Sequence, residues 1–151
     1  MKKFETINEI YDFAIQSEQE AVDFYNELAA ISKTDDMRNV FLQFAQEEIG
    51  HKARLTKIKN EGVYQLESQK IKDLKISDYT VNVKPASDMT YSEALILAMK
   101  KEKAAFKLYY ELSKRAVNEE MRNVFIALAQ DESKHKLRFE IEYDEFVLRD
   151  N

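Results

Sequence analysis

The sequence MRNVFLQFAQEEIGHKARL at residues 37–55 recurs as MRNVFIALAQDESKHKLRF at residues 121–139. The two copies lie 84 residues apart and are identical at eleven of nineteen positions. The same offset relates the tetrapeptides at residues 6–9 and 90–93, so the similarity extends toward the start of each half. Because a repeat at a fixed offset marks a structural unit that occurs twice, the sequence predicts an internal duplication across nearly the whole chain.

Length and composition predict one helical domain around these repeats. The chain has 151 residues, of which 44% are hydrophobic, and this is enough for a compact domain with a continuous core. With only two glycines and one proline, most of the backbone can run through long helices. We therefore predict an all-α fold in a single domain over residues 1–151.

Charge and missing residue types exclude several classes of function. The 23 basic and 28 acidic residues are mixed along the chain and give a net charge of −5, which argues against a nucleic-acid partner. The lack of cysteine excludes disulfides, thiolate sites and iron–sulfur clusters, so a transition metal must use His and carboxylate ligands. No stretch approaches the ~20 apolar residues of a membrane span. We expect a cytoplasmic protein without a membrane partner.

Capping signals mark the predicted helix boundaries. Thr6 and Thr90 each begin a Thr-x-x-Glu capping box, and Thr34 and Asn118 are N-cap residue types that are each followed by two acidic residues. Gly62 suits a helix C-terminus. The predicted helices cover residues 7–32, 35–61, 91–116 and 119–148.

Loop lengths predict how these helices are connected. Short turns make antiparallel hairpins of residues 1–62 and 91–151, and the longer segment 63–90, which contains Pro85, must cross the bundle between them. The first part of this crossover, residues 64–74, could form a short extra helix. The predicted architecture is a four-helix bundle, although a link of this length would equally permit a domain-swapped dimer.

One polar layer interrupts the apolar face of each predicted helix. Its members are Glu18, Glu48, His51, Glu102, Glu132 and His135. Four inward-facing carboxylates would repel one another strongly unless something neutralised them. In each Glu-x-x-His the two side chains share a helix face, so they can bind one ion together. Two divalent cations, iron or manganese, would balance the four carboxylates, and we predict a site for two metal ions.

Two tyrosines lie on the same faces as the predicted ligands. Tyr25 and Tyr109 follow Glu18 and Glu102 by seven residues, or about two helical turns. Their hydroxyl groups could donate hydrogen bonds to ligands and orient them. Alternatively, both are core aromatics whose hydroxyl groups find other partners.

Three further acidic residues lie beside the ligands. Glu20, Glu47 and Asp131 are expected on solvated faces, although Glu47 or Asp131 could instead orient a histidine on a neighbouring helix. Because six ligands converge, we expect little room at the site for a substrate larger than a diatomic molecule.

The pattern resembles the rubrerythrin-like branch of the ferritin-like di-iron carboxylate superfamily over all four helices. The resemblance rests on AIQSEQEAVDFY, QEEIGH, AMKKEKAAFKLY and QDESKH. It implies a ferritin-like bundle with two iron ions that reduces hydrogen peroxide or dioxygen, or oxidises Fe(II), as a peroxidase-type oxidoreductase in oxidative stress. By this resemblance Glu48 and Glu132 bridge the two ions, Glu18 and Glu102 are terminal ligands, and each histidine binds one ion.

Departures from that pattern refine the expectation. Without the cysteines of a rubredoxin domain, the electrons must come from an external donor such as a rubredoxin-like protein. Rubrerythrin usually has an extra carboxylate one turn beyond the ligand that Glu102 matches, and here that position is Ala105. Compared with bacterioferritin, Ile49 replaces the methionine that would bind haem, so no haem is predicted. We expect a homodimer or a higher homo-oligomer. The alternative functions are iron binding, buffering or storage without peroxidase turnover, and a metal-free helical interaction module.

Overall fold

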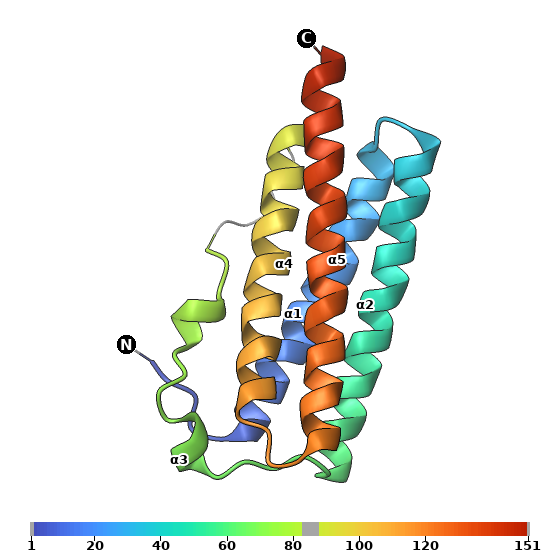
Figure 1. The fold of residues 1–151 in the computed structure, drawn as a ribbon. Coiled ribbons are helices and arrows are strands. Elements are labelled where there is room, and N and C mark those ends of the chain that lie inside the picture. Colours follow the sequence, from blue (N-terminus) through green and yellow to red (C-terminus); the bar gives the residue numbers. More distant parts are fainter. Residues whose placement is uncertain (1, 83–87, 151) are drawn as a thin grey trace.

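The computed structural model describes residues 2–82 and 88–150. The four long helices are α1 (Ile7–Ile31), α2 (Asp35–Glu61), α4 (Tyr91–Lys114) and α5 (Glu119–Asp150). In Figure 1, α1 and α2 run antiparallel, as do α4 and α5. The described residues form no β-strand, and none of their helices is both long and apolar enough to cross a membrane. The predicted all-α bundle of two helical hairpins is confirmed.

Both predicted capping boxes are present. The Thr6 hydroxyl accepts a hydrogen bond from the Glu9 amide at 3.1 Å, and the Glu9 carboxylate accepts one from the Thr6 amide at 3.4 Å. Thr90 and Glu93 form the same pair of bonds at 3.1 Å each. At its other end α2 stops at Gly62, whose φ of 64° lies in the left-handed region that favours glycine. Local sequence signals therefore fix these helix ends.

The other boundaries differ only slightly from the prediction. The side chains of Thr34 and Asn118 cap α2 and α5 by accepting hydrogen bonds from the amides three residues later, at 3.1 and 2.8 Å. Helix α1 ends at Ile31 and α4 at Lys114, slightly earlier than expected, whereas α5 continues to Asp150. Fraying at helix ends accounts for differences of this size.

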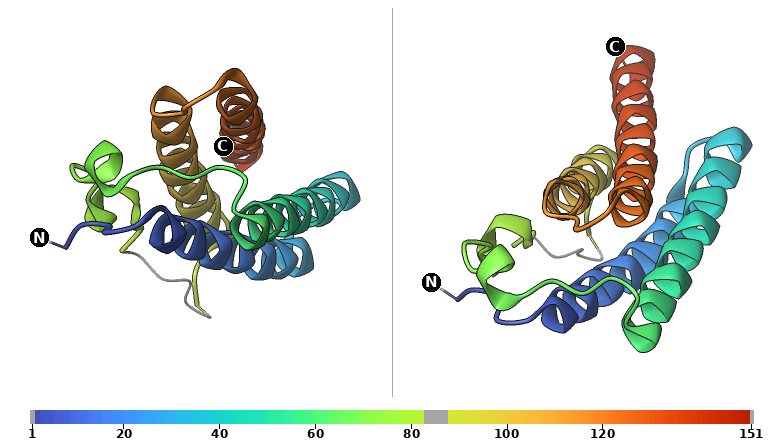
Figure 2. Two further views of the ribbon diagram at one scale, coloured as in Figure 1. Left: turned by 90° about the horizontal axis from the view of Figure 1, so that it is seen from below. Right: turned by 60° about the horizontal axis from the view of Figure 1, so that its bottom comes forward.

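The crossover is held against the bundle by specific contacts. Figure 2 shows its start running from the end of α2 across the bottom of the bundle toward α3 (Ser68–Ile71). Among the described residues of the crossover, these four and the 3-10 helix η1 (Ile76–Tyr79) are helical, so the extra helix expected over residues 64–74 is shorter than predicted. Arg115, the C-cap residue of α4, donates hydrogen bonds to the Lys70 carbonyl at 2.8 Å and to the Asp73 carboxylate at 2.8 and 3.1 Å. Pro85 lies outside the described residues.

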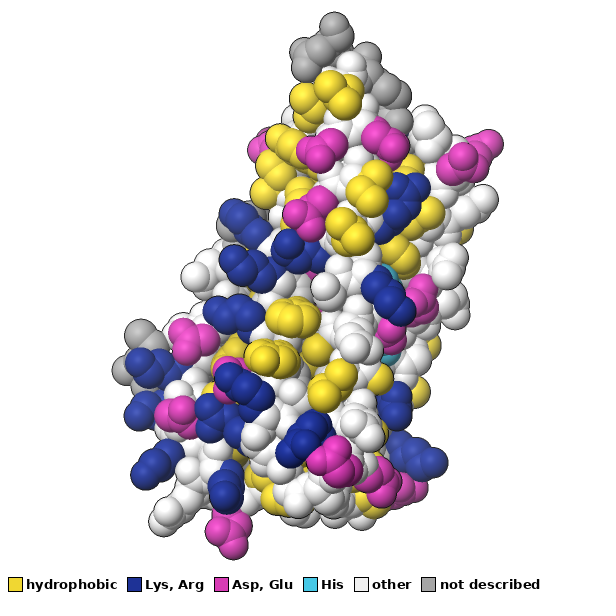
Figure 3. Space-filling model, viewed as in Figure 1, with side chains coloured by type: hydrophobic (Ala, Val, Ile, Leu, Met, Phe, Trp, Pro, Cys, Tyr) yellow, Lys and Arg dark blue, Asp and Glu magenta, His cyan; other side chains and the backbone are white. Residues whose placement is uncertain are grey.

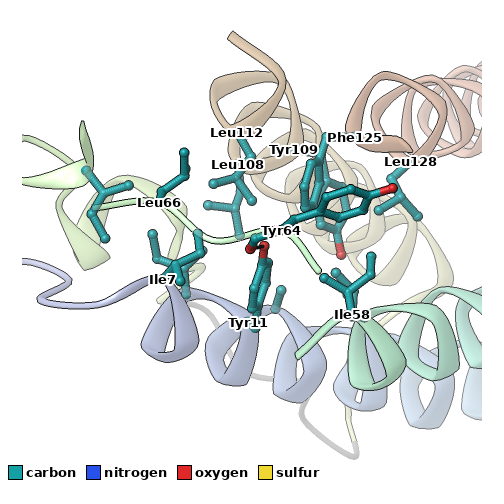
Figure 4. Close-up of a cluster of buried hydrophobic side chains, with 14 of the residues drawn as sticks. Ile7, Tyr11, Ile58, Tyr64, Leu66, Leu108, Tyr109, Leu112, Phe125 and Leu128 are labelled. Atoms are coloured by element: carbon teal, nitrogen blue, oxygen red, sulfur yellow. Dashed lines mark hydrogen bonds between the residues drawn. The ribbon is translucent and has the colours of Figure 1, made fainter. Parts of the chain in front are cut away.

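The hydrophobic core consists of two clusters, one toward each end of the bundle. Figure 4 shows side chains of the first cluster, which meet from all four long helices and the crossover. There Tyr11 stacks on Phe125 with ring centroids 6.3 Å apart, and its hydroxyl donates to the Tyr64 carbonyl at 2.6 Å. In the second cluster Phe139 stacks on Phe41 at 5.8 Å. The predicted polar layer lies between these two apolar clusters.

Candidate metal centre

The structure brings all six predicted ligand residues together within one chain. Helix α1 supplies one glutamate and α4 another, while α2 and α5 each supply a Glu-x-x-His pair. Each of the six is at most 7% exposed: Glu18, Glu48, His51, Glu102, Glu132 and His135. Their placement follows from helical spacing, because positions three or four residues apart turn toward the same side.

The six residues form two overlapping groups. In the first, one oxygen or nitrogen atom from each of Glu18, Glu48, His51 and Glu132 lies within 4.8 Å of the others. In the second, the same holds for Glu48, Glu102, Glu132 and His135. Glu48 and Glu132 belong to both groups, as a pair of bridging carboxylates would. The sequence offset of 84 residues relates one group to the other.

The donor atoms of this layer are of the kinds that bind cations. Within the described part of the chain, these buried atoms have no hydrogen-bond partner: Glu18 Oε2, Glu48 Oε1 and Oε2, His51 Nδ1, Glu102 Oε2, Glu132 Oε1 and His135 Nδ1. Each of the six residues contributes at least one such atom. A buried polar atom without a partner is destabilising, and carboxylate oxygens and imidazole nitrogens are ligands that iron and manganese accept. The residues present therefore fit two metal ions.

The pKa values of the carboxyl groups reflect their mutual repulsion. Burial and the charges of Glu102 and Glu18 raise the pKa of Glu48 to about 8. Burial and the charges of Glu102, Glu48 and Glu18 raise the pKa of Glu132 well above its usual value. The cluster therefore favours positive charge among its carboxyl groups, supplied by protons or by cations.

The histidines respond to the same charges in the opposite sense. Burial lowers the pKa of His51, but the neighbouring carboxylates of Glu18 and Glu48 outweigh burial and raise it to about 11. Burial also lowers the pKa of His135, but the Glu102 carboxylate outweighs burial and raises this pKa to about 9. Both rings are thus strongly attracted to the carboxylates that surround them.

The outer nitrogen of each histidine contacts an acidic residue on the facing helix. His51 Nε2 lies 3.1 Å from Asp131 Oδ2, and His135 Nε2 lies 3.4 Å from Glu47 Oε1. An N–H that donates to a carboxylate here leaves Nδ1 of the same ring free to face a metal ion. Both acidic side chains are partly exposed, at 42% for Asp131 and 38% for Glu47, and the contacts support the alternative that each orients a histidine on a neighbouring helix. The offset of 84 also relates these two residues, and this was a signal in the sequence for a paired role.

The two tyrosines contact ligand residues of the opposite hairpin. The Tyr25 hydroxyl donates to Glu102 Oε1, and the Tyr109 hydroxyl donates to Glu18 Oε1 at 2.6 Å. Burial, followed by the charge of the glutamate partner, raises the pKa of each phenol well above its usual value, so both keep their protons. Of the two interpretations of these tyrosines, the structure supports the hydrogen bond to a ligand residue.

A cavity of about 620 Å³ lies between α1 and α4 and reaches the layer. Its inner end is lined by Glu18, Glu48, Glu102 and Glu132, and neither histidine is among its described lining residues. The cavity therefore approaches the carboxylates from the side away from the imidazoles. The expectation of little room at the site considered the six ligands alone, whereas this cavity arises from the packing of α1 against α4.

Comparison with known proteins agrees with this architecture. The family model described as Rubrerythrin matches residues 9–143. A ferritin-like diiron-carboxylate protein from Thermotoga maritima superposes with a TM-score of 0.75 at 23% identity, covering 96% of this chain and 99% of that one.

A hypothetical protein from Pyrococcus furiosus superposes with a TM-score of 0.71 at 22% identity, covering 92% of this chain and 89% of that one. No curated protein matches the chain. The likeness to the Thermotoga maritima structure shows that the fold of the bundle is ferritin-like. Because the family model spans most of the sequence, the chain belongs to the rubrerythrin family.

Proposed function

We propose that the protein is a di-iron oxidoreductase that reduces hydrogen peroxide or dioxygen with electrons from an external donor. The observation that carries this proposal is the convergence of buried carboxylate oxygens and imidazole nitrogens that make no hydrogen bond, at least one from each of the six residues of the layer. The Thermotoga maritima neighbour is described as a diiron-carboxylate protein, which supports iron over manganese. Two bound iron ions would supply two electrons, the number that converts one peroxide molecule to two water molecules.

The chain's own residues would divide the work of holding two ions. Glu48 and Glu132 belong to both groups, so each of them would be shared by the two ions. Glu18 and Glu102 would each hold one ion, and so would Nδ1 of His51 and of His135. The four carboxylates balance two divalent charges, so the layer would be neutral with both imidazoles uncharged.

The tyrosines and the cavity serve the same reaction. Tyr109 Oη holds a proton 2.6 Å from Glu18 Oε1, and Tyr25 holds one beside Glu102 Oε1. These bonds orient the two terminal carboxylates, and they keep protons near a reaction that consumes two of them. The cavity between α1 and α4 gives a small oxidant access to the carboxylate side of the layer.

Anaerobic titration tests the proposal. Metal-free protein should bind two Fe(II) per chain, and one equivalent of hydrogen peroxide should then oxidise both ions, seen as near-ultraviolet ferric absorbance. The variant with Glu48→Ala and Glu132→Ala removes both shared carboxylates and should do neither. Peroxide that oxidises bound Fe(II) no faster than free Fe(II) would contradict the redox proposal. Elemental analysis of protein purified without added metal separates iron from manganese.

Two other functions give different results in the same preparation. Storage requires many more than two irons per chain after aerobic loading, together with a large closed oligomer. A metal-free interaction module predicts that no Fe(II) binds at all. The unpartnered atoms of the layer argue against this last function, because a helical module would gain nothing from burying them.

A further inference from the structure

The walls of the cavity between α1 and α4 differ in charge. Three acidic residues of α1, spaced by three and four positions, line the cavity and are exposed to solvent: Glu20, Asp23 and Glu27. With the offset of 84, their counterparts on α4 are Ala104, Lys107 and Glu111. Figure 3 shows Lys and Arg side chains gathered over α4. The row of three acidic residues on α1 is therefore not repeated on α4, where only Glu111 of the three counterparts is acidic.

The inner end of the cavity is also acidic. Glu18 Oε2 and Glu102 Oε2 are buried without a hydrogen-bond partner, and both residues line the cavity. Among its described lining residues seven are acidic and Lys101 is the one basic residue. Lys101 Nζ lies over the ring of Phe24, 5.7 Å from its centroid. Carboxylates thus line the cavity from its solvent-exposed end to the buried layer.

Packed side chains lie at both ends of the layer and on its His135 side among the described residues. The two apolar clusters lie on either side of it along the bundle. On the histidine side, Phe44 stacks on His135 with ring centroids 4.0 Å apart, and Glu47 and Asp131 contact the outer ring nitrogens. A hydrated cation that came along the bundle or past His135 would have to displace packed side chains, among them Phe44.

We propose that this cavity is the path by which divalent metal ions reach the layer, with Glu20, Asp23 and Glu27 as its outer carboxylates. The inference rests on the proposed function, because it assumes that the layer binds metal. Exposed carboxylates along low-dielectric walls raise the local concentration of cations and speed their association. Each carboxylate can also replace a water of the arriving ion before the buried glutamates do.

The test measures how fast the full metal-free chain binds Co²⁺, a redox-inert probe with visible absorbance when bound by nitrogen and oxygen. The variant with Glu20→Gln, Asp23→Asn and Glu27→Gln should load about tenfold more slowly at low ionic strength. The matched control is Glu140→Gln, Asp144→Asn and Glu145→Gln on α5, where none of the three residues lines the cavity. It removes the same charge and should load within twofold of the wild type.

Two further readouts separate the path from the site. The difference between the cavity variant and the wild type should shrink as salt rises, because exposed charges are screened. Both should still bind two Co²⁺ at saturation. A second variant, Ala104→Phe, narrows the cavity without changing its charge and should also slow loading.

Wild-type loading rates in both cavity variants would overturn the proposed path and leave the metal site standing. Failure of the wild type to bind Co²⁺ at all would instead overturn the site itself.

Discussion

Each histidine of the layer faces carboxylates with one ring nitrogen and an acidic residue of the facing helix with the other. Asp131→Asn keeps the size of the side chain beside His51 but removes its charge. We expect metal affinity to fall by about 10- to 100-fold, as is typical when the carboxylate behind a ligating histidine is lost. Competition titration against a chelator measures this.

Asp144→Asn, an exposed change elsewhere on α5, serves as the control and should leave the affinity unchanged. Equal affinities for Asp131→Asn and the wild type would show that the contact with His51 does not tune the ligand.

Tyr109 matters through a single buried hydrogen bond. Tyr109→Phe removes the donor to Glu18 Oε1 and leaves a carboxylate oxygen without a partner. Metal-free protein should lose about 1–3 kcal/mol of unfolding free energy, because an unsatisfied buried polar group carries that cost. Urea denaturation measures the loss. Tyr110→Phe, at an exposed neighbouring position, is the control and should change the free energy little.

At the scale of the element, the two glycines of the chain have opposite roles. Gly62 ends α2 with φ at 64°, whereas Gly50 lies inside α2, where an added Cβ would meet nothing within 4 Å. Gly62→Ala should destabilise by about 1 kcal/mol, since the left-handed conformation disfavours a side chain. Gly50→Ala should stabilise by roughly 0.5–1 kcal/mol, because alanine is the better helix former. Thermal unfolding of the metal-free variants compares them, and shifts of the same sign would contradict the assignment.

Local signals predict the helices better than the connection between them. Thr6 and Thr90 cap their helices through hydrogen bonds with residues only three positions away, so these helix starts can be predicted from the sequence. The crossover instead depends on distant partners, such as Arg115 with Asp73, and on which apolar residues find space in the core. The short helix suggested over residues 64–74 is therefore limited to Ser68–Ile71.

At the scale of the whole molecule, the pKa values predict how stability depends on pH. The pKa of Glu48 rises to about 8, that of His135 to about 9 and that of His51 to about 11. The folded metal-free protein therefore binds more protons than the unfolded chain between about pH 4.5 and 11. Its unfolding free energy should fall as pH rises through this range. Urea melts at several pH values test this sign.

The stabilisation that bound metal gives should depend on pH in the opposite sense, increasing as pH rises. Ligands must lose their protons before they bind a cation, so metal affinity increases with pH. The rise in melting temperature on adding metal should therefore be larger at pH 8 than at pH 6, and a chelator should remove it. A shift that does not depend on pH would indicate that the ions bind outside the layer.

The site was predictable in its membership and not in its surroundings. The four glutamates and two histidines on the apolar helix faces can be identified from their spacing alone, because a helix places residues at a fixed period. The partners of Tyr25 and Tyr109 were not, since each bond joins two hairpins whose relative position only the folded chain defines. The cavity has the same origin, because it depends on how closely α1 approaches α4.

The bonds from Tyr25 to Glu102 and from Tyr109 to Glu18 have the form of contacts between two identical subunits. Two separate hairpins related by a two-fold axis could form the same two hydrogen bonds, but their association would then depend on the protein concentration. Joining both copies in one polypeptide replaces that limit with an effective concentration set by the linker. It also frees the copies to diverge: an acidic α1 facing a lysine-bearing α4 is a difference that a symmetric pair of identical subunits could not hold.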